Sequence, residues 1–345
     1  MDGVYILKTR YYGAKTKLIP NLEKVFSEIE FSSATDLFGG TGVVSLLLAN
    51  MGKQVVYNDG FLFNGAIARA VLASSSSLPS KNDVEKEIKK IIPKDGVVSR
   101  NFEGIFYKDF ENNWLDGYLQ SRSKHQSLLS DVVFYCVAQA CLKKRPFNLF
   151  HRANLYLRDN SEVERSFGNK YSWDKSFLDH CLLSLSELYS IPRKFSDEKI
   201  KIYSKSAEEV LVETELLYLD PPYITKSGSE SYLKRYHFLE GMYIYPEWES
   251  LISNKFKSKS LVGYEFVEKS STKVGLISLM DKVISRFKGR YIVLSYLKDG
   301  LDVYEKLKDL ISNEGFDITE YELDHKHVLS KNSVSEVIVV GRKYG

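Results

Sequence analysis

Two prolines between an aspartate and a tyrosine, Asp220-Pro221-Pro222-Tyr223, follow an apolar segment at 216–219 that predicts a buried strand. The prolines fix a turn and remove two N–H donors, so carbonyl oxygens face the cleft beyond the carboxyl end of the strand. The Asp220 carboxylate and the Pro221 carbonyl can then accept hydrogen bonds from both N–H groups of an amine on a planar base. The Tyr223 ring can stack on the same base. We predict that these four residues form a catalytic turn that orients such an amine and frees its lone pair.

A second group of residues lies in the segment D-L-F-G-G-T-G, between a predicted first strand and a helix, and consists of Asp36, Phe38, Gly40 and Gly42. Glycines at such a turn let a ligand approach the backbone, and the following helix offers its N-terminus. Asp59 ends the next strand, where an acidic side chain can bind the two hydroxyls of a ribose. The pattern favours a nucleoside without phosphates over a dinucleotide. A glycine turn with a structural role is the alternative.

A third group, Tyr11, Gly13 and Lys15, lies near the beginning of the chain. A lysine beside a glycine is typical of a solvated turn when nothing else surrounds it. Within a nucleoside site, Tyr11 would line the pocket and Lys15 would reach a carboxylate of the ligand.

The elements that would position these groups alternate between strand and helix at both ends of the chain. A helical spacing at 16–30 precedes a strand at 35–38, the glycine turn, a helix at 43–51 and a strand at 54–58, which is a βαβ unit. The alternation stops from about 61 to 200 and then resumes. The pattern predicts an α/β fold, a Rossmann-like sheet domain at 1–60 and 200–345 with a mostly helical inserted domain at 61–199. The later elements expected are helices at 84–92, 127–142, 207–212, 280–287 and 301–312, and strands at 200–203, 216–219, 291–296, 316–323 and 334–340.

Composition and charge exclude several classes of protein. With 43% hydrophobic and 27% charged residues, the chain is globular rather than disordered or fibrous. No stretch approaches the ~18 apolar residues of a membrane span, and the first residues show no secretion signal. The three cysteines form no C-x-x-C pair, so they predict buried free thiols in a reducing compartment, the cytoplasm, and no metal site.

The net charge of +3 hides a local excess of basic residues at 141–176. That segment contains eight basic and four acidic residues, with six aromatic residues between them. A basic surface with interleaved aromatic rings is what phosphate contact and base stacking require. The segment therefore indicates a nucleic-acid surface, and a solvated charged helix and loop is the alternative.

These elements and their order resemble the Dam-like, alpha-ordered group of N6-adenine DNA methyltransferases. The resemblance rests on Y-x-G-x-K at 11–15, D-x-F-x-G-x-G at 36–42 and D-P-P-Y at 220–223, and it covers essentially the whole chain. It implies that the cofactor is S-adenosylmethionine, released as S-adenosylhomocysteine, and that the insert carries the target-recognition region. By the same resemblance, Ser204 and Ser206 would lie near the adenine of the cofactor.

Within the insert, the segment N-L-F-H-R-A-N at 148–154 resembles the family segment N-G-x-x-R-x-N, which contacts DNA. The resemblance implies DNA contacts from Asn148, Arg152 and Asn154, a wedge at Phe147 beside a flipped base, and a further DNA contact from Phe150. Two other segments, 232–243 and 295–296, are candidates either to contact DNA or to pack in the core, with 232–243 expected to form a loop over the target.

The implied reaction is direct methyl transfer to N6 of an adenine flipped out of double-stranded DNA, without a metal. A cognate restriction endonuclease is an expected partner, and a membrane is not. Three alternatives remain open on the sequence: an RNA adenine methyltransferase, a cytosine-N4 methyltransferase, and a non-catalytic nucleic-acid-binding protein with a methyltransferase fold.

Overall fold

A computed structural model describes residues 15–122, 127–146, 149–159, 170–224, 231–298, 302–323 and 335–344 of the 345-residue chain. The chain divides into two compact units, each assembled from three segments. The helical unit contains Met1–Thr16, Leu62–Arg193 and Leu233–Tyr264. The sheet unit contains Lys17–Phe61, Lys194–Tyr232 and Glu265–Gly345. The two units are described separately below.

The sheet unit is built on a seven-stranded sheet of order β3-β2-β1-β4-β5-β7-β6. Strands β1 to β5 pair in parallel, whereas β7 is antiparallel to both β5 and β6. Because the order reverses between β1 and β4, the carboxyl ends of these strands form the topological switch point at which α/β sheets bind ligands. The strands are β1 Ser33–Asp36, β2 Gln54–Asn58, β3 Ile200–Tyr203, β4 Leu216–Leu219, β5 Tyr291–Lys298, β6 Asp317–Leu323 and β7 Ser335–Arg342.

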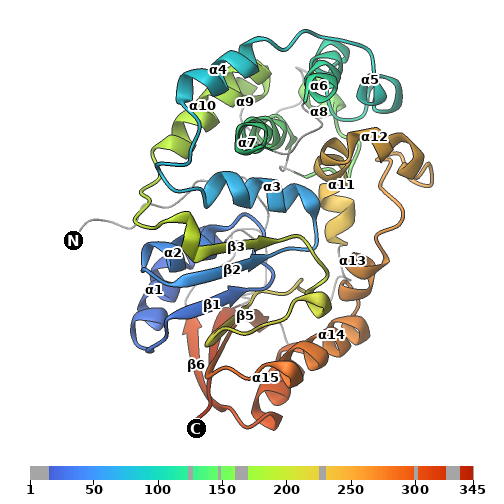
Figure 1. The fold of residues 1–345 in the computed structure, drawn as a ribbon. Helices are drawn as coiled ribbons and strands as arrows, with labels where there is room; N and C mark the ends of the chain where they lie inside the picture. The colour runs from blue at the N-terminus through green and yellow to red at the C-terminus, as the bar shows by residue number, and fades with distance from the viewer. Residues whose placement is uncertain are drawn as a thin grey trace. The chain divides into compact units, whose positions relative to one another are not determined.

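Helices cover both faces of this sheet, as Figure 1 shows. Successive side chains of a strand point to opposite faces. In β4, Leu217 and Leu219 therefore join the core beneath α14 and α15, whereas Tyr218 packs edge-on against Phe26 of α1. Burial of β4 on both faces explains its wholly apolar sequence. The helices of this unit are α1 Ile19–Ser27, α2 Val43–Asn50, α13 Glu265–Ser270, α14 Lys273–Arg286 and α15 Val303–Asn313, with short 3-10 turns at Asp197–Lys199 and Ala207–Glu209.

The helical unit is organised around α7, Leu128–Lys143, in which every residue from Asp131 to Lys143 is buried. A helix that is apolar on all sides must lie inside a bundle, and α3, α4 and α10 pack against it. A cluster of aromatic rings joins the rest of the unit, with Phe102 packed on both Phe238 and Trp248. The other helices are α3 Leu62–Val71, α4 Lys81–Lys89, α5 Val97–Asn101, α6 Asp109–Ser121, α8 Tyr156–Asp159, α9 Lys170–Asp174, α10 Phe177–Tyr189, α11 Tyr232–Tyr243 and α12 Tyr245–Trp248.

The predicted α/β fold class is confirmed, and most predicted strands agree with the structure to within two residues. The segment 207–212 forms only the 3-10 turn Ala207–Glu209 and not the expected helix. The expected loop at 232–243 is also wrong, because this segment is helix α11 with most of its side chains buried. The helical unit includes Leu233–Tyr264, which the predicted boundaries left in the sheet domain. The aromatic contacts of Phe238 and Trp248 with Phe102 account for that difference.

All three cysteines are buried free thiols, as predicted. Within the part of the chain that the structure describes, no helix combines the length and apolar character needed to cross a membrane. Among the same residues, no group of three or more histidine, cysteine or acidic side chains is arranged to hold a metal ion.

Candidate active site

Asp36 is the last residue of β1, next to β4 at the switch point of the sheet. Its side chain is buried, with 1% exposed, and its Oδ2 accepts a hydrogen bond of 2.7 Å from Ser45 Oγ in α2. Its Oδ1 has no hydrogen-bond partner among the described residues. Burial raises the pKa of Asp36 to about 7, since the Ser45 bond only partly offsets it and the nearby Asp220 and Asp59 charges add to it. A buried carboxylate with one oxygen that accepts no hydrogen bond from the described residues is suited to bind a cation.

The turn that follows β1 depends on its glycines. Gly40 and Gly42 adopt positive φ angles of 50° and 74°, a region that favours glycine. At Gly39, a Cβ atom would lie 2.2 Å from Cε2 of Tyr57, so the ring of Tyr57 occupies the space of a side chain. The Tyr57 hydroxyl donates a 2.6 Å hydrogen bond to the Gly40 carbonyl. The turn is therefore held against β2 and leads directly into the N-terminus of α2.

The carboxyl ends of β2 and β3 are joined through Asn58. Its Oδ1 accepts the Lys205 N–H at 3.1 Å and its Nδ2 donates to the Lys205 carbonyl at 3.1 Å. Asp59 follows immediately, and its two oxygens accept the backbone N–H groups of Gly40 at 3.0 Å and Phe61 at 2.9 Å. This arrangement brings the segment containing Ser204 and Ser206 to the same edge of the sheet as Asp59. Ser206 also caps the short 3-10 turn Ala207–Glu209, and Phe38 packs in part against the sheet core.

The Asp220-Pro221-Pro222-Tyr223 turn begins directly after β4 and is half-buried apart from the buried Pro221. Tyr296 of β5 supports it, because the Tyr296 hydroxyl accepts the Ile224 N–H at 3.0 Å and donates to the Pro222 carbonyl at 3.5 Å. The rings of Tyr223 and Tyr296 meet edge to face, with centroids 5.2 Å apart. The turn therefore projects from the sheet beside β1, and Asp220 lies close enough to Asp36 to influence its pKa.

The third predicted group lies mostly beyond what the structure describes. Tyr11 and Gly13 are outside the described residues. Lys15 is described and buried, with 6% exposed, and belongs to the helical unit. Its expected contact with a ligand carboxylate stays a prediction.

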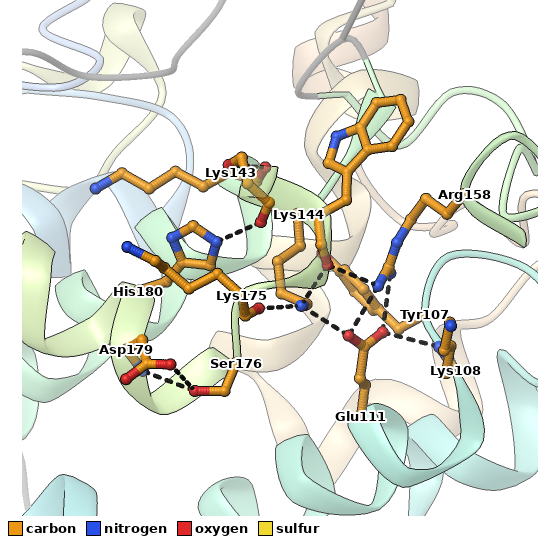
Figure 2. A network of polar contacts seen from close by, with 12 residues as sticks. Tyr107, Lys108, Glu111, Lys143, Lys144, Arg158, Lys175, Ser176, Asp179 and His180 are labelled. Atoms are coloured by element: carbon orange, nitrogen blue, oxygen red, sulfur yellow. Dashed lines mark hydrogen bonds and ion pairs between the residues drawn. The ribbon is translucent and has the colours of Figure 1, made fainter. Parts of the chain in front are cut away.

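In the helical unit, the structure describes residues 141–146, 149–159 and 170–176 of the segment that was predicted to form a basic, aromatic surface. Four of its basic residues are buried and bind groups inside the protein. Figure 2 shows Lys143, Lys144 and Arg158 among them. Arg158 makes a bidentate ion pair with Glu111 of α6, with both N–O distances at 2.8 Å, and Lys144 contacts the same carboxylate at 2.8 Å. A buried cation must be paired, and Glu111 supplies the counter-charge for two of them. The buried basic residues are Lys143, Lys144, Arg145 and Arg158.

Among the predicted DNA contacts of the insert, some residues are buried, one is exposed and others lie outside the described residues. Phe150 is completely buried and stacks on Phe238 at 4.9 Å between ring centroids, so it offers no ring face to a base. Asn154 is also buried, with its Oδ1 lacking a hydrogen-bond partner among the described residues. Arg152 is exposed. Phe147 and Asn148 lie outside the described residues.

Several residues that shape the site were not predicted. Ser45 lies in the first turn of α2, just after Gly42, and Asn58 is the last residue of β2, just before Asp59. A polar side chain at either position is a signal that could have indicated them. Tyr296 was a candidate to contact DNA, but it is buried with 1% exposed and supports the turn after β4. Glu336 of β7 accepts a hydrogen bond from Tyr223, and no local sequence signal connects residues 113 positions apart.

Comparison with known proteins identifies the family. A model of the D12 class N6 adenine-specific DNA methyltransferases matches residues 11–288, which is most of the chain. The chain belongs to this family. The description of the family names adenine N6 in DNA as the site of methylation.

Individual relatives of this methyltransferase are distant in sequence. It is 24% identical to the Type II methyltransferase M.FokI of Planomicrobium okeanokoites over 94% of this chain, and it spans only 50% of the length of that relative. It is 20% identical to the Type II methyltransferase M.NlaIII of Neisseria lactamica, with 90% of each chain covered. A solved structure described as a putative class I S-adenosylmethionine-dependent methyltransferase of Listeria monocytogenes matches at 10% identity, covering 95% of this chain and 88% of that chain. The TM-score of this match is 0.25.

Proposed function

We propose that this methyltransferase holds S-adenosylmethionine at the carboxyl edge of its sheet and methylates an adenine that has left the DNA duplex. The observation that carries the proposal is the placement of the Asp220-Pro221-Pro222-Tyr223 turn beside Asp36, at the ends of the adjacent strands β4 and β1. The turn binds an amine on a planar base, and Asp36 accepts a cation. Methyl transfer from a sulfonium to an amine requires both groups at neighbouring positions.

The residues at this edge fit the cofactor. The orphaned Oδ1 of Asp36 provides an acceptor for a cationic group, and the glycine turn allows close approach to the backbone. Asp59, with its carboxylate at the end of β2, is the candidate for the ribose hydroxyls, and Ser204 and Ser206 are candidates for the adenine edge. Phe38, Gly40 and Gly42 complete the proposed cofactor set, together with Tyr11, Gly13 and Lys15. When bound, S-adenosylmethionine supplies an electrophilic methyl group.

On the side of the target base, the Asp220 carboxylate and the Pro221 carbonyl accept hydrogen bonds from the two N–H groups of the amine. These hydrogen bonds would draw the nitrogen toward tetrahedral geometry and free its lone pair for the new N–C bond. The N–C bond would replace the S–C bond of the methyl donor, and the methylated nitrogen would release its extra proton to water. Pro222 keeps the turn rigid, and Tyr223 offers a ring to the base. Positioning and polarisation supply the rate, and no strong base is required.

The ionisation of Asp36 should control cofactor affinity. Because burial places its pKa at about 7, the carboxylate is largely neutral at pH 6 and largely ionised at pH 8. A cation prefers the ionised form, so affinity for S-adenosylmethionine should rise between these values, as isothermal calorimetry can measure. Asp36→Asn should bind more weakly and lose most of this dependence. An equal pH dependence in the variant would show that another group is responsible.

On the side of the DNA, Arg152 is the member of the predicted contact set that is both described and exposed. If its guanidinium binds a phosphate, Arg152→Ala should weaken DNA affinity and lower the slope of log K against log salt concentration by about 1. Fluorescence anisotropy at several salt concentrations measures both quantities. Lys94→Ala removes an exposed cation between α4 and α5 and serves as the matched control. Equal slopes for the two variants would contradict a specific role for Arg152.

The relatives named above are Type II methyltransferases, which supports a restriction-modification context for this chain and a cognate endonuclease as partner. Three buried free thiols are consistent with action in the cytoplasm. A direct test of the whole proposal is incubation with tritiated S-adenosylmethionine and either duplex DNA or RNA, followed by digestion to nucleosides. We expect N6-methyl-2′-deoxyadenosine from duplex DNA. Label in RNA or in N4-methylcytosine would reject the proposed substrate.

A further inference from the structure

The tyrosine of the Asp220-Pro221-Pro222-Tyr223 turn is hydrogen-bonded to β7, the second strand from β4 in the sheet. Its hydroxyl donates a 2.8 Å hydrogen bond to Oε1 of Glu336, a residue of β7 that is buried with 8% of its surface exposed. Ser295 Oγ of β5 donates to the same oxygen at 3.4 Å. A carboxyl group inside a sheet domain is costly unless it is hydrogen-bonded, and these two hydroxyls satisfy one of its oxygens.

The contact restrains the ring of Tyr223 at its outer end. Tyr296 already meets that ring edge to face at 5.2 Å, and it also binds the backbone after the turn at Ile224. A tyrosine side chain has two rotatable bonds, and these two contacts together define the plane of its ring. The hydroxyl oxygen lies on the axis about which the ring turns, so Glu336 restrains the position of the outer end of the ring and Tyr296 restrains its rotation about that axis.

The charge distribution keeps the hydroxyl a donor. Burial raises the pKa of Tyr223 well above its ordinary value, and the carboxylates of Asp220 and Glu336 add to this effect. The phenol is therefore protonated and able to donate to Glu336.

We propose that Glu336 is a positioning residue for methyl transfer, which holds the Tyr223 hydroxyl and so fixes the direction of the ring that meets the target adenine. The inference rests on the proposed function, in which Tyr223 stacks on the base. Glu336 does not touch the base or the cofactor. It acts through Tyr223, by removing a rotation that would otherwise have to be restricted at each turnover.

Glu336→Leu and Glu336→Gln are the informative variants. Glu336→Leu removes the acceptor, and we expect kcat for DNA methylation to fall by about 10- to 100-fold, the scale expected for small errors in positioning. The dissociation constant for S-adenosylmethionine should not change, since Asp36 and Asp59 are untouched. Glu336→Gln keeps an acceptor oxygen, so it should recover most of the lost rate. Glu322→Gln, an exposed glutamate of β6 that pairs with Lys298, is the matched control and should keep the wild-type kcat.

A double-mutant cycle separates positioning from general destabilisation. Tyr223→Phe removes the hydroxyl but keeps the ring, so the Tyr223→Phe/Glu336→Leu double variant should be no slower than the slower single variant. Additive losses would overturn the inference. If Glu336→Leu does not fold, Tyr223→Phe decides, because it removes the same hydrogen bond and keeps the ring. A wild-type kcat in Tyr223→Phe would overturn the inference as well. A wild-type kcat in folded Glu336→Leu would also overturn it. If the wild-type enzyme itself transfers no methyl group to DNA, the proposed function fails first, and the inference fails with it.

Discussion

Asp220→Ala should abolish methyl transfer to DNA, with a loss in kcat of at least about 10²–10³-fold. The variant removes the carboxylate that accepts one N–H bond of the target amine, and the Pro221 carbonyl alone cannot hold the amine in the attacking geometry. Backbone structure should survive, because the turn is held by the two prolines and by the bonds of Tyr296 to Ile224 and Pro222. Incorporation of tritiated methyl groups into DNA measures the loss.

Cofactor affinity should distinguish a loss of catalysis in Asp220→Ala from a loss of the folded site. Asp220 raises the pKa of Asp36, after the larger effect of burial, so its removal should favour ionised Asp36 and leave cofactor affinity at least as high at neutral pH. Calorimetry with S-adenosylmethionine should therefore show binding by a protein that no longer transfers the methyl group. Asp281→Ala, which removes an exposed carboxylate from α14, should change neither quantity. Substantial transfer by Asp220→Ala would remove Asp220 from the mechanism.

The parts of the fold that the sequence predicts are those in which local pattern and burial agree. Strands β2 and β4 were predicted with the bounds that the structure has, because both are short apolar or β-branched segments followed by an acid at the strand end. Since β2 and β4 both pair in parallel with β1, the structure brings Asp59 and Asp220, which follow them, to one edge of the sheet. Helix α11 was missed because it is buried on almost every side, so its sequence shows no amphipathic periodicity.

The parts that could not be predicted depend on partners far away in sequence. The basic residues at 141–176 were expected to bind phosphate, since a local charge count cannot show whether a cation faces solvent or a buried acid. Glu111 lies more than 30 positions before Lys144 and 47 before Arg158. In the same way, nothing near Tyr223 indicates Glu336. Sequence patterns locate residue types at strand ends, whereas the pairing of buried charges becomes visible only in the folded chain.

Replacing Glu111 with alanine should lower the free energy of unfolding of the helical unit by about 3–5 kcal/mol, the cost of breaking a buried ion pair from one side. The Arg158 and Glu111 side chains are only 3% and 4% exposed, and Lys144 is 2% exposed. The Glu111 carboxylate also accepts the Lys108 N–H at 2.9 Å, which caps the start of α6. The variant would therefore leave two buried cations without their counter-charge and one helix end without its cap.

The three tryptophans, Trp114, Trp173 and Trp248, all belong to the helical unit, so their fluorescence during urea denaturation reports on this unit. Glu87→Ala is the matched control, because Glu87 pairs with Lys90 on the surface of α4, where the two side chains are 45% and 67% exposed. That exposed pair should contribute at most about 1 kcal/mol. Equal stabilities for the two variants would show that the buried network adds nothing to the fold.

The dependence on pH provides a second, independent readout of the same network. Burial tends to raise the pKa of Glu111, but the hydrogen bonds and charges of Arg158 and Lys144 outweigh it and lower the pKa below its ordinary value of 4.5. A carboxyl group whose pKa is lower in the folded state stabilises the protein above its unfolded pKa, and this contribution is lost as the pH falls through the folded value. The wild-type unit should therefore lose stability below about pH 4.5 more steeply than Glu111→Ala. Parallel curves for the two proteins would mean that Glu111 is not held ionised by its two cations.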